Sequence, residues 1–124
     1  IRQQSGQALV EAAFVLPVLI LIIMGGVGVS AGILDRQVLH AAAAEAARYG
    51  TLALEDGTRI PLEEVREIAL AGARGLVLSR DPAATVTATG LSRGDTLTVT
   101  MEARTAPILL DFGTVRAAFV ARYQ

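Results

Sequence analysis

The stretch AAFVLPVLILIIMGGVGVSAGIL, residues 12–34, decides how this chain is organised. None of its residues carries a charge, and about 20 apolar residues suffice for a helix to cross the hydrocarbon core of a bilayer. A buried core helix is the alternative, but a domain cut from 124 residues could hardly surround so long an apolar helix. A cleavable secretory signal would have a shorter apolar core. We therefore expect a membrane-spanning helix with a cytoplasmic N-terminus and an exported head.

The composition agrees with one membrane helix and one light head. Hydrophobic residues make up 52% of the chain and the mean hydropathy is +0.51, yet only 4% of residues are aromatic. The net charge of −1 leaves no basic face for nucleic acid. The chain has no cysteine, so it can form neither a disulfide nor a thiolate metal site. We expect no cofactor and no metal.

The apolar stretch and its flank contain residues that predict helix packing. Glu11 stands at the cytoplasmic end, where a carboxylate is costly if drawn into the bilayer. Pro17 favours a kink, with local unwinding. Small residues let two helix backbones approach closely, and Gly28 and Gly32 have the GxxxG spacing. The glycines that we expect to pack against other helices are Gly25, Gly26, Gly28 and Gly32. The alternative is that these glycines have no packing role, because glycine is in general more frequent in membrane helices than in soluble ones.

The residues GQALVEAAFVLP at 6–17 resemble the N-terminus of TadE-like proteins, which are pilin-like components of tight-adherence pilus systems. The segments 37–39 (QVL) and 46–50 (AARYG) are similar to the same family. The resemblance implies that a prepilin peptidase cuts after Gly6, that Gln7 becomes the new N-terminus, and that Glu11 becomes its fifth residue. It also implies that Glu11 pairs with the terminal amine of a neighbouring subunit and sets the register of assembly. Processing upstream of Ile1 is the alternative, and Glu11 would then fall outside this rule.

The rest of the chain predicts a small α+β head. We expect the first helix to run from about residue 7 to 48, with Gly50 as its C-cap and a loop over 52–58. An amphipathic stripe predicts a second helix over 61–78. Alternation with a period of two predicts about three antiparallel strands. Their expected ranges are 84–89, 95–104 and 114–123.

The chain thus divides into a segment 1–34, with the leader-like residues and the membrane helix, and a head 35–124. The apolar residues 108–110 are expected to plug the core or contact a partner.

No group of residues predicts catalysis. His40 is the single histidine and lies on an alanine-rich stretch without a carboxylate at metal-ligand spacing. Glu63, Glu64 and Glu67 suit the first turns of a helix, where acids favour the helix dipole. Aspartates 81, 95 and 111 lie at expected turns. We therefore expect a protein that is not an enzyme.

These features predict a structural subunit of a cell-surface pilus. The subunit would rest in the cytoplasmic (inner) membrane and then assemble with copies of itself into an extracellular adhesion filament, served by the prepilin peptidase and the pilus secretion machinery. Two alternatives remain open. The chain could be a minor TadE-like pseudopilin of the assembly machinery, or a monomeric membrane-anchored periplasmic binding domain.

Overall fold

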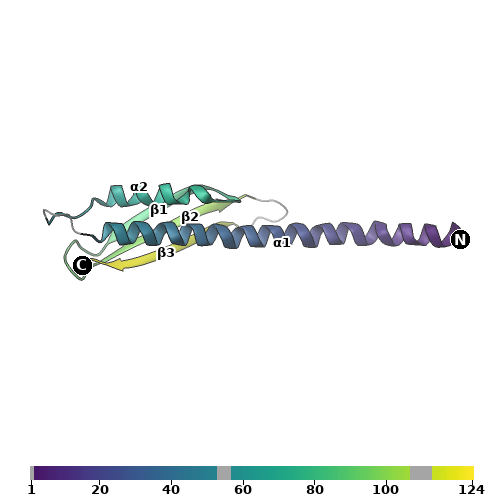
Figure 1. The fold of residues 1–124 in the computed structure, drawn as a ribbon, viewed down its shortest axis with the longest axis horizontal. Helices are drawn as coiled ribbons and strands as arrows, with labels where there is room; N and C mark the ends of the chain where they lie inside the picture. Colours follow the sequence, from purple (N-terminus) through teal and green to yellow (C-terminus); the bar gives the residue numbers. More distant parts are fainter. Residues whose placement is uncertain (1, 53–56, 107–112) are drawn as a thin grey trace.

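The computed structural model describes residues 2–52, 57–106 and 113–124. The chain begins with one long helix, α1 (Arg2–Gly50), followed by α2 (Leu62–Gly72) and a short 3-10 turn, η1 (Ala73–Gly75). Three strands complete it: β1 (Ser79–Ala88), β2 (Thr96–Thr105) and β3 (Thr114–Arg122). Figure 1 shows the head gathered around the C-terminal half of α1, while the N-terminal half extends away from it. The predicted α+β fold, with one long helix, one short helix and three strands, is confirmed.

The three strands form an antiparallel sheet in the order β1-β2-β3. Thr87 pairs with Thr98, and Thr98 pairs with Val120, in one row across the outer face. β1 begins at Ser79, earlier than the residue 84 predicted by alternation. The ladder is interrupted between Arg80 and Ala83, where Asp81 has a positive φ of 52°. Because an irregularity of this kind breaks the two-residue period, the pattern in the sequence identified only the second part of the strand.

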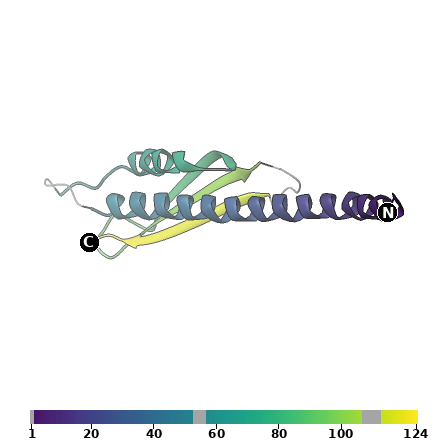
Figure 2. The ribbon, with the colours of Figure 1, turned by 45° about the vertical axis from the view of Figure 1, so that its right-hand side comes forward.

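The core lies between the inner face of the sheet and the two helices. Residues 97, 99, 101, 103 and 105 of β2 are buried, whereas the residues between them are not. α1 covers β2 and β3, and α2 lies against α1 and β1. Figure 2 shows these two layers from a second direction. Amphipathic α2 ends at Gly72 and continues only as η1, so it is shorter than the predicted 61–78.

Small residues bring the elements of the head close together. A Cβ atom added at Gly72 would lie 2.9 Å from the Cβ of Ala42, so α1 and α2 approach through these two positions. A Cβ atom at Gly50 would lie 2.6 Å from Cγ2 of Val65 and 2.7 Å from Cδ2 of Leu97. Gly50 is the last residue of α1 and its φ is not positive. The predicted C-cap role is therefore wrong, and glycine is needed there because a side chain has no room.

α1 is one continuous helix over its whole length. The predicted local unwinding at Pro17 is wrong, because residues on both sides remain helical and neither Figure 1 nor Figure 2 shows a break. Proline removes one backbone hydrogen bond, and here the helix continues through the gap. The predicted contact of residues 108–110 lies outside the described residues.

Candidate functional site: an uncovered helix and its junction with the head

The N-terminal half of α1 presents apolar side chains on all sides. Leu9 is 72% exposed and Phe14 is 75% exposed, and the large side chains from Val15 to Ile23 are exposed in the same way. The helix is long and apolar enough to cross a membrane: its most apolar window of 18 residues has a mean hydropathy of 2.6, and only 6% of that window is buried. An apolar surface of this extent marks a site of contact with a membrane or with other proteins.

The residues predicted for processing and register lie on this uncovered part. Gly6, Gln7 and Glu11 are exposed members of α1. Glu11 makes no ion pair within the described part of this chain. Its carboxylate is therefore accessible to a cation of a neighbouring molecule. The roles predicted for Gly6, Gln7 and Glu11 depend on a peptidase and on neighbouring subunits, and they stay predictions.

The four glycines divide into two pairs. Gly25 and Gly26 have open space where a side chain would be, and Gly26 is exposed. Gly28 is buried and Gly32 is half-buried, and both line a groove between α1 and the sheet. The pair with GxxxG spacing thus faces the protein's own head, while the prediction that the glycines and Pro17 pack against other helices stays a prediction.

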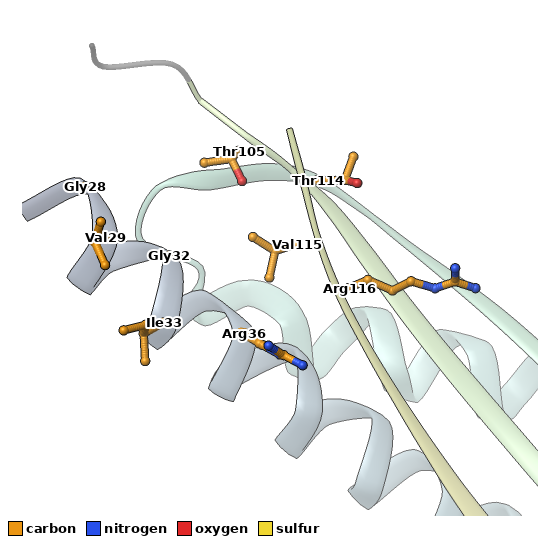
Figure 3. A pocket seen from close by; sticks show the side chains of 9 residues that line it. All are labelled: Gly28, Val29, Gly32, Ile33, Arg36, Thr105, Thr114, Val115 and Arg116. Carbon is orange, nitrogen blue, oxygen red and sulfur yellow. The ribbon is translucent and has the colours of Figure 1, made fainter. Parts of the chain in front are cut away.

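This groove has a volume of about 470 Å³. One wall is α1, with Val29, Ile33 and Arg36 beside the two glycines. The other wall comes from the adjacent ends of β2 and β3, as Figure 3 shows. These strands contribute Thr105, Thr114, Val115 and Arg116. The groove therefore combines apolar surface with hydrogen-bonding groups, and it lies where the uncovered part of α1 ends and the head begins.

Asp35 joins α1 to the head and is fully buried. Its Oδ1 accepts a hydrogen bond from the Val77 N–H at 2.6 Å. Its Oδ2 accepts two more, from the Leu78 N–H at 2.9 Å and the Ser79 N–H at 2.6 Å. Asp35 and Arg36 are the first charged residues after the uncharged run 12–34, a position that predicts the return of the chain to water, and this prediction is wrong for Asp35. Arg36 is exposed.

The environment of Asp35 keeps its carboxylate ionised. Burial by itself raises the pKa of this carboxyl, but the hydrogen bonds from Val77, Ser79 and Leu78 together outweigh burial and lower the pKa below the ordinary 3.8. Hydrogen bonds to a charged acceptor are stronger than neutral ones. Sequence reasoning missed this residue because its partners are backbone groups more than 40 residues away, which leave no motif.

Three of the residues considered for catalysis, His40, Glu63 and Glu64, make local contacts in the head. The rings of His40 and Phe119 are in T-shaped contact, with ring centroids 5.8 Å apart. Glu63 pairs with Arg66 at 3.0 Å, and Glu64 accepts a hydrogen bond from the Tyr49 hydroxyl. That hydrogen bond and the charge of Glu64 raise the pKa of Tyr49. Among the described residues, no three acids or histidines are grouped to hold a metal ion.

Together these features define a class: a helix of membrane-spanning length carrying a small α+β head at its C-terminal half. The family model of TadE-like proteins matches residues 6–48, a segment that lies within α1 and does not reach the strands. This match covers residues 6–17, 37–39 and 46–48, so it confirms the resemblance drawn from these segments, and it supports a Tad pilus-associated protein. No curated protein and no solved structure matches the chain significantly.

Proposed function

We propose that this chain is a structural pilin subunit, which is inserted in the cytoplasmic membrane before assembly and then assembles through α1 into an extracellular filament. The observation that carries the proposal is the uncovered N-terminal half of α1. Its apolar side chains need a lipid or protein environment, and copies of the same helix would supply a protein one. The TadE-like segment supports the association with a pilus.

Glu11 gives the assembly a means of register. An isolated carboxylate inside a bundle of apolar helices is costly, and an ammonium group beside it offsets much of that cost. Cleavage after Gly6 would create such an ammonium group on Gln7 of the neighbouring subunit. Only the position that brings the two charges together would then be favoured.

Fibres sheared from cells and examined by negative-stain microscopy and mass spectrometry test the proposal. We expect them to contain this polypeptide as the main component, with Gln7 as its first residue. Fibres that lack the polypeptide would assign it instead to the assembly machinery, as a minor TadE-like pseudopilin. An unprocessed chain with no fibres would favour a membrane-anchored periplasmic domain.

The Glu11→Gln substitution tests the register mechanism separately. We expect far fewer fibres while the amount of chain in the membrane stays the same, because the amide cannot neutralise the amine. Glu67→Gln is the matched control, since Glu67 is an exposed acid on α2. Equal fibre yields from the two variants would exclude the charge pair.

A further inference from the structure

We propose that the groove between α1 and the ends of β2 and β3 binds the phosphate head group of one membrane phospholipid. The lining residues that matter here are Val29, Gly32, Ile33 and Arg36 from the helix and Thr105 and Arg116 from the strands. The inference rests on the membrane-inserted state of α1 and does not require the filament.

The position of the groove along α1 matches the head-group layer. Taking Glu11 as the inner boundary, a hydrocarbon core about 30 Å thick takes about 20 helical residues, from Ala12 to Ala31. Arg36 lies five residues further, or about 7.5 Å along the helix axis. Head groups add about 5–7 Å on each side of the hydrocarbon. The backbone of Arg36 thus lies at the outer edge of the head-group layer, and because side chains of a helix tilt toward its N-terminus, the guanidinium points back toward the lipid phosphates.

The polar groups of the groove suit a phosphate. Arg36 is exposed and makes no ion pair among the described residues, and guanidinium groups bind phosphate through charge-assisted hydrogen bonds. Thr105 is only 2% exposed, and its hydroxyl has no hydrogen-bond partner. An unsatisfied buried hydroxyl is costly, and in the groove wall it offers a donor to a phosphate oxygen.

The remaining lining suits an acyl chain. Val29 and Ile33 are about half exposed on the helix side of the groove, and Gly32 leaves open space between them and the strands. The guanidinium of Arg116 is held by Glu102 at 3.1 Å on the outer face of the sheet, and Figure 3 shows it directed away from Arg36. Arg36 is thus the cation that we assign to the phosphate.

Native mass spectrometry of the full chain in detergent tests this site with three probes. These are phosphatidylglycerol, diacylglycerol with the same acyl chains, and glycerol 3-phosphate. We expect one molecule of phosphatidylglycerol to be retained, and neither of the other two. Retention of diacylglycerol to the same extent would overturn the role of the phosphate, and equal retention of glycerol 3-phosphate would overturn the role of the lipid.

Two pairs of variants locate the site. Arg36→Gln should weaken retention of phosphatidylglycerol about tenfold, the loss expected for one charge-assisted contact. Arg122→Gln, which makes the same change at an exposed position near the C-terminal end of β3, should leave it unchanged. Gly32→Leu should fill the groove, whereas Gly26→Leu on the exposed side of α1 should not. Equal binding within either pair would overturn the assignment. Fibre formation is measured separately from lipid retention, so a failure of the filament proposal can be distinguished from a failure of the lipid site.

Discussion

Replacing Asp35 with Asn should weaken the attachment of the head to α1. The carboxylate accepts three backbone hydrogen bonds, two of them on Oδ2. Asparagine offers one oxygen and one NH₂ group, so at least one N–H among residues 77–79 would face a donor. A hydrogen bond to a charged group contributes about 1.5–3 kcal/mol, and an unsatisfied buried donor costs about 1–3 kcal/mol. We expect the head to lose about 2–4 kcal/mol of unfolding free energy.

Hydrogen exchange measured by mass spectrometry on the full chain in detergent micelles can follow this loss. The amides of Val77, Leu78 and Ser79 should exchange faster in the Asp35→Asn variant. Asp81→Asn is the matched control, because Asp81 is exposed and Asn tolerates its positive φ. That control should change the free energy by about 0.5 kcal/mol or less. Equal exchange in the two variants would refute the role of the carboxylate.

The stabilisation of the head by the Asp35 carboxylate depends on pH in a defined direction. The pKa of Asp35 is lower in the folded protein than the ordinary 3.8, so the unfolded state binds the proton more readily. The stabilisation by the carboxylate is therefore complete above the unfolded pKa and is lost as the pH falls through the folded pKa. We expect the difference between the wild type and Asp35→Asn to be constant near neutral pH and to shrink below about pH 4. A difference that stays the same at low pH would contradict this mechanism.

Two other substitutions test the packing of the head by the same hydrogen-exchange measurement. Gly50→Ala should destabilise it by about 1–3 kcal/mol, because the new methyl group overlaps Val65 and Leu97; Gly75→Ala, whose nearest neighbour would be 3.8 Å away, should not. Tyr123→Phe should be neutral or slightly stabilising, since the ring is buried while its hydroxyl has no partner, and a loss above about 1 kcal/mol would show that the hydroxyl is satisfied.

The parts of the fold with a regular period could be predicted from the sequence. The uncharged run 12–34 predicted a helix because nothing else accommodates so many consecutive apolar residues, and the threonine alternation placed β2 within one residue of its observed bounds. β1 was placed too late because Asp81 breaks the alternation. The groove could not be predicted, since its walls come from segments about 75 residues apart in sequence.

Alanine packing explains why a buried carboxylate is useful at the junction. The head-facing side of α1 includes Ala42, Ala43, Ala46 and Ala47, which are all buried. Such small side chains allow close approach but give a smooth surface, on which neighbouring registers differ little in packing energy. Three directed hydrogen bonds to Asp35 favour one register, because any shift of the head along α1 would leave the charge unpaired. Since α1 is continuous, the orientation fixed at Asp35 also fixes how the head is placed relative to Glu11, about 36 Å away along the helix.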